Sequence, residues 1–387
     1  MGSPRTRRSA AGRGKPVSDR APVGFGRRDA QPEAQDRDAD RGFPTGAPRL
    51  DDQIVAGLIP ERPVRGHKGS FGKLLVIAGS LDYAGAALLV CRAAGRSGVG
   101  LVTLAVPESL QPLFAAKVIE ATTMALPEDD VEEIDPEPAM ARILDHEHDA
   151  IVVGPGLRPG LATTELVRSL LPVAAGTDAA PIVLDAEALR SMATMDGWWE
   201  GERRPAVLTP HAGEFARLRA GSGDQPADDG DLEADDEARL TAALDAAAMW
   251  RSVVVLKGAR TIIAAPDGAA AIAPFENPAL ATGGTGDVLA GTIGGLLAQG
   301  LEPYAAAQLG VYLHGLAGDA ARERFGDAGV LASDLPDALA AARKRLVALA
   351  ERRKATNRLG FTARQTPPIP VALPIAPPGA RPPGDLS

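Results

Sequence analysis

The chain has 387 residues, a formal net charge of −9 at pH 7 and a single cysteine, Cys91. The negative balance excludes a general nucleic-acid binder, which would carry a basic stripe. A lone cysteine excludes an intramolecular disulfide and a cysteine-based zinc site, and the apolar neighbours of Cys91 favour a thiol packed in a helix face. No apolar run reaches about 18 residues, and none follows the Arg-rich first residues, so we expect neither a membrane span nor a secretory signal. A cytoplasmic protein is expected.

Composition divides the chain into three parts. Residues 1–48 are rich in Arg, Asp, Gly and Pro without a hydrophobic period, and residues 351–387 form a proline-rich tail, so both ends are expected to be disordered. Residues 49–350 show regular apolar patterning and are expected to form a single domain. Within this domain, the acidic segment 221–238 is expected to be a surface loop or the start of a solvated helix.

Short runs that are apolar throughout recur along the domain, and alanine-rich segments of helical length separate most of them. Such runs are typical of strands buried on both faces, and their alternation with helices predicts a mainly parallel central sheet flanked by helices, an α/β fold. In such sheets, ligands bind beyond the carboxyl ends of the strands. The predicted strands are KLLVIAG (73–79), GLVTLAV (100–106), AIVVGPG (150–156), PIVLDAE (181–187), PAVLTPH (205–211) and SVVVLKG (252–258).

The strongest local signal is a glycine-rich turn, ATGGTGDVLAG, at residues 281–291. Free amides at a helix N-terminus, with the positive end of the helix dipole behind them, suit a phosphate group. The alternative is an ordinary Asp N-cap, but capping does not require Gly283, Gly284 and Gly286 together. We therefore predict that Asp287 is a base facing a substrate hydroxyl, and we expect the helix N-terminus to lower its pKa. The segment matches neither a Walker A loop nor a Rossmann fingerprint.

Two further motifs follow predicted strands. VLTPHAGEF (207–215) places His211 at a strand end, where we predict a functional role, and Glu214 three residues later, where an acid favouring the helix dipole is an equally good interpretation. VVVLKGARTII (253–263) predicts a hairpin. Its turn either exposes polar residues to solvent or binds a nucleotide through Lys257, Thr261 and the backbone between them.

Weaker signals lie in three other places. The small residues at 85–87 either pack a helix closely or allow a flat ring system or a pyrophosphate to approach the backbone. Gly154 and Gly156 stand at one predicted strand end, and Asp185 stands at another.

Taken together and in order, these segments resemble the carbohydrate-kinase-like NAD(P)H-hydrate dehydratases, which form the C-terminal half of bifunctional NAD(P)H-hydrate repair proteins. The resemblance covers about residues 60–340 and implies a ribokinase-like fold. The GxGD turn also occurs in hydroxymethylpyrimidine, thiazole and sugar kinases. TPHxGEF together with HKGxFG and KGxxT favours the dehydratases over these kinases. The segments that carry the resemblance are HKGSFGKLLVIAGS, GAA, GPG, VLDAEAL, LTPHAGEF, LKGART, LATGGTGDVLAG and VYLHGLAGD.

The resemblance implies that ADP, or else ATP, phosphorylates the hydroxyl of S-NADHX or S-NADPHX with the help of Mg²⁺. Loss of phosphate then restores NADH or NADPH and leaves AMP or ADP. Glu214 follows His211 at the spacing that related kinases use near magnesium, so it is the predicted metal ligand, although His replaces the Asn of those kinases. By the same resemblance, Ala86, Gly156, His211 and Asp287 contact the hydrated dinucleotide, with Asp287 catalytic, and Lys257, Gly258, Ala259, Arg260, Thr261 and Gly286 contact the adenine nucleotide.

Two departures from the family are visible. About 50 residues precede the match, too few for the epimerase domain of many relatives, so we expect a separate epimerase. Glu276 stands where relatives often have glycine. Relatives form tetramers, so a homo-oligomer is expected.

Two other functions stay open. One is a small-molecule kinase of the same fold, acting on a vitamin precursor such as hydroxymethylpyrimidine and releasing a stable phosphorylated product. The other is a non-catalytic nucleotide sensor, which the combination of Asp287, the glycine turn and His211 disfavours.

Overall fold

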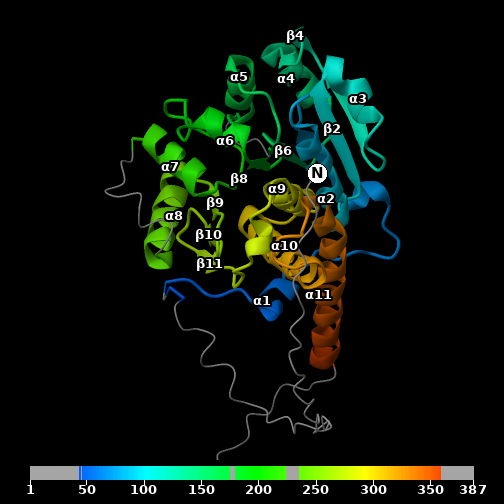
Figure 1. Cartoon of the computed structure of the whole chain (residues 1–387), viewed down its shortest axis with the longest axis vertical. Helices are drawn as coiled ribbons and strands as arrows, with labels where there is room; N and C mark the ends of the chain where they lie inside the picture. The colour runs from blue at the N-terminus through cyan, green and yellow to red at the C-terminus, as the bar shows by residue number, and fades with distance from the viewer. Residues whose placement is uncertain (1–42, 45, 175–178, 224–234, 359–387) are drawn as a thin grey trace, which may run out of the picture. The chain divides into compact units, whose positions relative to one another are not determined.

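The computed structural model describes residues 43–44, 46–174, 179–223 and 235–358. In these residues the apolar runs form one nine-stranded sheet, in the order β11-β10-β9-β8-β7-β6-β1-β2-β3, and a separate pair, β4-β5 (Figure 1). Neighbours from β3 to β9 are parallel, whereas β10 is antiparallel to both of its neighbours. The strands are β1 (Lys73–Ile77), β2 (Leu101–Pro107), β3 (Thr122–Leu126), β4 (Glu128–Asp130), β5 (Glu133–Ile134), β6 (Ala150–Val153), β7 (Ile182–Leu184), β8 (Ala206–Leu208), β9 (Val253–Leu256), β10 (Ile262–Ala264) and β11 (Ala270–Ile272).

Helices cover both faces of the large sheet, so alternate strand residues are buried in two separate cores. Leu74 and Val76 of β1 belong to one core, and Leu75 and Ile77 belong to the other. Burial on both faces explains why the strands are apolar throughout. Within the described residues, no helix combines the length and the apolar character needed to cross a membrane. The first core is covered by α1 (Asp52–Ala56), α2 (Ala84–Ser97), α3 (Gln111–Ala115), α9 (Thr285–Ala298), α10 (Pro303–Phe325) and α11 (Leu335–Arg358), and the second by α4 (Pro136–Asp145), α5 (Leu161–Leu170), α6 (Glu187–Met192), α7 (Ala212–Gly221) and α8 (Asp236–Trp250); short 3₁₀ turns lie at Lys68–Phe71, Glu108–Leu110, Pro278–Leu280 and Ala332–Asp334.

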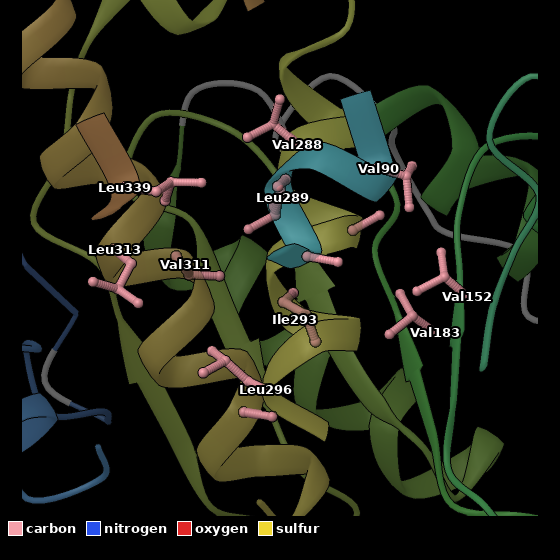
Figure 2. Close-up of a cluster of buried hydrophobic side chains, with 14 of the residues drawn as sticks. Val90, Val152, Val183, Val288, Leu289, Ile293, Leu296, Val311, Leu313 and Leu339 are labelled. Carbon is pink, nitrogen blue, oxygen red and sulfur yellow. The ribbon is translucent and has the colours of Figure 1, made fainter. Parts of the chain in front are cut away.

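Helix α9 is the central helix of the first layer. A Cβ added at Gly294 would lie 2.2 Å from Cγ2 of Val152 on β6, and one added at Gly291 would lie 2.3 Å from the carbonyl oxygen of Val90 on α2. Only glycine therefore allows α9 to pack so closely against the sheet and against α2. Because both neighbours fix α9, the position of its N-terminus is fixed as well. Figure 2 shows Val288, Leu289, Ile293 and Leu296 of α9 packed with side chains of α2, α10 and the sheet.

The structure confirms the predicted strands and the hairpin. All six apolar runs form strands, namely β1, β2, β6, β7, β8 and β9, and residues 253–263 form the antiparallel pair β9-β10. Cys91 is buried in α2, and burial raises the pKa of its thiol to about 12, so the packed thiol is confirmed too.

Ordered structure extends beyond both expected domain boundaries. The carbonyl of Pro48 accepts a hydrogen bond of 3.0 Å from the backbone of Ile272, so the chain before residue 49 already lines the edge strand β11. At the other end α11 continues to Arg358, past the expected boundary at residue 350. The expected domain limits of 49 and 350 stay a prediction. The rest of both predicted disordered ends, and most of the acidic segment before α8, lie outside the described residues.

Candidate active site

The candidate site lies along the carboxyl edge of the sheet. Asp185 directly follows β7, His211 follows β8 after two residues, and Lys257 directly follows β9. The N-terminus of α9 reaches the same edge, since a Cβ added at Gly286 would lie 3.5 Å from Nζ of Lys257. The parallel topology thus gathers segments that are far apart in the sequence.

The first turn of α9 forms a rigid, uncapped helix N-terminus. Gly284 is the N-cap, has a left-handed φ of +92° and supplies no side-chain cap. The hydroxyl of Thr285 donates to the carbonyls of Leu280 at 2.7 Å and Thr282 at 2.9 Å. Nε2 of His314 donates to the carbonyl of Thr285 at 2.9 Å, and burial lowers the pKa of this histidine to about 4, so the ring is neutral. An N-terminus held in this way presents its amides to an anion.

One lysine and three carboxyl groups form the charged cluster of the site. Nζ of Lys257 lies 2.9 Å from Oδ1 of Asp185 and 3.7 Å from Oε2 of Glu214, and Asp287 completes the cluster. Burial by itself lowers the pKa of Lys257, but the three neighbouring carboxylates outweigh it and raise the pKa above its ordinary value. Lys257 therefore stays protonated.

Asp287 is the third residue of α9, so it is not the N-cap that the alternative interpretation required. Burial, helped by repulsion from Asp185, raises its pKa to about 7, against an opposing effect of Lys257. The expectation of a lowered pKa is therefore wrong, because the loss of solvation outweighs the helix dipole. A carboxyl group that titrates near neutrality is a better base than an ordinary aspartate.

The backbone beside Asp185 is strained and closely packed. The next residue, Ala186, has φ 50° and ψ −115°, a combination that is unfavourable for any residue with a Cβ. Gly154 packs directly on this segment, since an added Cβ would lie 1.9 Å from the carbonyl oxygen of Asp185. Strain of this kind persists where the surroundings enforce it and is concentrated at functional sites. It singles out Asp185, for which the sequence gives only a weak signal.

His211 and Glu214 cap the N-terminus of α7 reciprocally. Oε2 of Glu214 accepts the backbone N–H of His211 at 2.9 Å, and Nδ1 of His211 accepts the N–H of Gly213 at 3.1 Å. The interpretation of Glu214 as a first-turn helix acid is therefore confirmed, and its metal-binding role stays a prediction. The imidazole of His211 is 56% exposed, so its ring is accessible to a ligand from the solvent side.

Ala86 and Gly156 are neighbours beside the N-terminus of α2. Gly156 has a left-handed φ of +66°, and a Cβ added there would lie 2.9 Å from Cβ of Ala86 and 2.7 Å from the carbonyl oxygen of Tyr83. Tyr83 is the N-cap of α2 and supplies no side-chain cap. Two residues predicted mainly by resemblance thus lie together, next to a second uncapped helix N-terminus.

A cavity of about 460 Å³ opens beside the N-terminus of α9. Arg260, with a left-handed φ of 53°, is not part of its lining: its guanidinium pairs with Asp236 at 3.3 Å and with Glu276. The remaining predicted nucleotide residues do line the cavity, namely Lys257, Gly258, Ala259, Thr261 and Gly286, and the apolar part of the lining, suited to a flat ring, includes Ala273, Phe275, Pro278, Leu280 and Val311.

Replacing Gly286 by Val is expected to weaken ADP binding by about tenfold or more, because the side chain would intrude between Lys257 and the cavity. Titration calorimetry with ADP measures the effect. Gly95→Val is the control, since Gly95 lies on α2 outside the cavity and has open space for a Cβ. Equal ADP affinity of the Gly286→Val and unmodified proteins would contradict the assignment of Gly286 to the nucleotide site.

Residues 74–341 match the carbohydrate-kinase family described as NAD(P)H-hydrate dehydratase. The chain is 43% identical over 284 residues to a bifunctional NAD(P)H-hydrate repair enzyme of Moorella thermoacetica, a match that covers 73% of this chain and 51% of that protein. It is 38% identical over 276 residues to an ADP-dependent (S)-NAD(P)H-hydrate dehydratase of Xanthomonas campestris, covering 70% of this chain and 88% of that protein. The chain thus spans about half the length of the bifunctional relatives it matches.

Solved structures of the same fold are also similar. A crystal structure of an ADP/ATP-dependent NAD(P)H-hydrate dehydratase from Bacillus subtilis, co-crystallized with ATP and Mg²⁺, matches with a TM-score of 0.65 and 34% identity, over 78% of this chain and 99% of that chain. A ribokinase-like protein from Enterococcus faecalis matches with a TM-score of 0.64 and 27% identity, over 79% of this chain and 98% of that chain. The predicted ribokinase-like α/β fold is therefore confirmed.

Proposed function

Because this chain belongs to the NAD(P)H-hydrate dehydratase family, we propose that it uses ADP or ATP to convert S-NADHX and S-NADPHX back to NADH and NADPH. The observation that carries the proposal is the setting of Asp287. Its carboxyl group has a pKa of about 7, lies in the first turn of the uncapped helix α9 and adjoins Lys257 at the cavity. A base and an anion site side by side are what phosphoryl transfer to an alcohol requires.

In the proposed reaction Asp287 removes the proton from the hydroxyl of the hydrated nicotinamide ring while that oxygen bonds to the terminal phosphorus of the nucleotide. The bond from this phosphorus to the bridging oxygen breaks, which leaves AMP from ADP or ADP from ATP. The amides of α9 stabilise the charge on the transferred group. The ring then loses phosphate and a proton from the adjacent carbon, and the new double bond restores the dihydropyridine.

Lys257 brings a permanent positive charge to the edge of the cavity, and carboxylates beside it suit a metal–nucleotide complex. Mg²⁺ commonly takes one or two protein carboxylates together with phosphate oxygens. Asp185 and Glu214 are carboxylates of this kind, and we infer that they would hold the ion. In the described residues no group of three or more His, Cys, Asp or Glu side chains could hold a metal. When bound, Mg²⁺ would neutralise charge on the phosphates.

Several finer points belong to the same proposal. We infer that ADP is the preferred donor, supported by the ADP-dependent relative from Xanthomonas, and that ATP can replace it. A separate epimerase would supply the S hydrates from their epimers. We propose that the protein acts in the cytoplasm as a homo-oligomer, and light scattering tests the expected tetramer.

The value of kcat/KM for the hydrate is expected to rise with pH up to about 7 and then to level off. A base acts only when deprotonated, and Asp287 is mostly protonated below its pKa of about 7. The expected acid limb is about tenfold per pH unit below the pKa. Initial rates from pH 5.5 to 9 at saturating ADP measure it. A rate independent of pH across this range would contradict the role of Asp287 as the base.

The proposed function is tested by the near-ultraviolet absorbance of reduced nicotinamide after addition of protein, Mg²⁺ and ADP, and separately ATP, to purified S-NADHX. The absorbance is expected to rise with a nucleotide present and to stay flat without one. A flat trace with both donors would refute the dehydratase. The vitamin-precursor kinase would then be tested by phosphorylation of hydroxymethylpyrimidine.

A further inference from the structure

A buried cation lies behind the turn that joins β9 to β10. Arg239 of α8 is 5% exposed and takes no part in the mechanism above. One guanidinium nitrogen, Nη1, donates to the carbonyl of Ala259 at 2.8 Å and to Oδ1 of Asp236 at 2.7 Å. The other, Nη2, donates to the carbonyl of Leu256 at 3.4 Å. A single side chain therefore ties together the two ends of the segment that lines the cavity.

The two peptide groups that Arg239 contacts are also fixed on their opposite sides. The N–H of Lys257, in the same peptide as the Leu256 carbonyl, donates to the carbonyl of Pro210 at 2.8 Å. The N–H of Arg260, in the same peptide as the Ala259 carbonyl, donates to the carbonyl of Phe275 at 2.9 Å. Both peptide planes are therefore locked, and the amides between them, at residues 258 and 259, are held at the wall of the cavity.

Gly258 is the residue that makes room for this arrangement. A Cβ added there would lie 2.7 Å from Nη2 of Arg239, closer than a Cβ can approach. The end of an arginine can usually move aside, but here it is buried and held by three acceptors. Gly258 therefore leaves room for the side chain of Arg239 on one side of the turn and lines the cavity on the other.

The support continues on the outer side of the turn. Asp236, which accepts from Arg239, also pairs through Oδ2 with Arg260 at 3.3 Å, and Arg260 pairs in addition with Glu276. The guanidinium of Arg260 stacks over the ring of Phe43 at 4.4 Å. These contacts hold Arg260 in its left-handed conformation, with φ 53°. A series of ion pairs, from Arg239 through Asp236 and Arg260 to Glu276, therefore supports the turn on the side away from the cavity.

We propose that Arg239 is a positioning residue for the nucleotide site, holding the turn at residues 257–261 in the conformation that receives the adenine nucleotide. The proposal rests on the proposed function, because it takes the cavity beside this turn as the site of ADP. It gives a role to a residue of α8 that touches neither the cavity nor the charged cluster. A planar guanidinium can bind two carbonyls and a carboxylate at once, which an ammonium group in its place could not do with the same geometry.

The test compares Arg239→Met, which keeps the volume but removes the donors, with Arg239→Lys, which keeps the charge. We expect Arg239→Met to weaken ADP binding by about tenfold or more and to raise the KM for ADP equally, because a displaced turn no longer fits its ligand. At saturating ADP, kcat and the KM for S-NADHX are expected to change by less than about twofold. The KM for ADP of Arg239→Lys should lie between that of Arg239→Met and that of the unmodified protein. Gly258→Ala should also raise the KM for ADP.

Arg203→Met is the matched control. Arg203 also donates to two carbonyls, those of Trp198 at 3.0 Å and Trp250 at 2.8 Å, but it lies before β8, away from the carboxyl edge. The Arg203→Met variant should lose thermal stability as Arg239→Met does, but it should keep the ADP affinity of the unmodified protein. If calorimetry shows equal ADP affinity for Arg239→Met and the unmodified protein, the positioning role is refuted and the proposed function stands. If the unmodified protein binds neither ADP nor ATP, the nucleotide cavity is wrong and the role of Arg239 falls with it.

Discussion

Replacement of Asp287 by Asn is expected to lower kcat by about a thousandfold while ADP affinity changes by less than about threefold. Asn has nearly the same shape as Asp but cannot accept the proton of the substrate hydroxyl. The amides of α9 and the cavity stay in place, so the nucleotide still binds. Single-turnover formation of reduced nicotinamide measures the rate, and calorimetry measures ADP binding. A near-normal kcat in Asp287→Asn would show that Asp287 is not the base.

The same substitution is expected to stabilise the fold, which separates loss of chemistry from loss of structure. The pKa of Asp287 is about 7 in the folded chain and about 3.9 in an unfolded one. Between these values the folded state keeps a proton that the unfolded state releases, so the fold loses stability as pH rises through this window. Asp287→Asn removes that loss. With a discount for partial solvent screening, a gain of roughly 1 kcal/mol is expected above pH 7 and almost none near pH 4. Thermal melts at both pH values measure it.

The sequence predicts the interior of the sheet well and its edge poorly. The six central strands are buried on both faces, so they read as unbroken apolar runs. The edge strand β3 (Thr122–Leu126) has partly exposed threonines and alternates in burial, which leaves no apolar run to recognise. Strand β11 is only three residues long, and its partner on one side, Arg49, stands at the very start of the expected domain, outside any predicted strand. Edge pairing depends on tertiary contacts that local patterning does not contain.

The candidate site shows the same division. The glycine turn and Lys257 could be predicted because a strand end or a helix start marks each of them in the sequence. The raised pKa of Asp287 could not, because it depends on burial and on Asp185, a residue about 100 positions away in the chain. His314 entered only within a resembling segment, since a lone histidine in an apolar helix carries no local signal. Arg239 carried no local signal in the sequence either, because a charged residue near a helix N-terminus is ordinarily interpreted as part of a surface salt bridge.

Burial, Asp185 and Lys257 together set the pKa of Asp287. Asp287 is a better base than an ordinary aspartate only because its carboxyl group is poorly solvated. Without a positive charge in the cluster, the same poor solvation would keep this carboxyl group protonated and neutral. Lys257 supplies that charge and opposes the effects of burial and of Asp185 on the pKa of Asp287. The pKa of about 7 is therefore a balance between burial and one lysine, and removing the lysine should upset it.

Lys257→Met is accordingly expected to have the second large effect, on stability and on pH dependence together. Removing the cation leaves Asp185, whose side chain is 3% exposed, without its 2.9 Å partner. Loss of one partner of a buried pair typically costs about 3 kcal/mol. The pKa of Asp287 should rise above about 7, so the acid limb of the rate profile moves to higher pH. Denaturant melts and the pH dependence of kcat/KM measure the two effects.

Two further variants separate charge from packing in this prediction. Adding Asp185→Asn to Lys257→Met removes the unpaired carboxylate, so the double variant should regain part of the stability but none of the activity. Lys73→Met is the matched control, because Lys73 pairs with Glu147, which is 83% exposed, so loss of this solvent-screened pair should change the stability little. If Lys257→Met is no less stable than Lys73→Met and keeps the acid limb near pH 7, the lysine does not set the pKa of Asp287. The pKa of about 7 would then reflect burial and Asp185 without an opposing effect of Lys257.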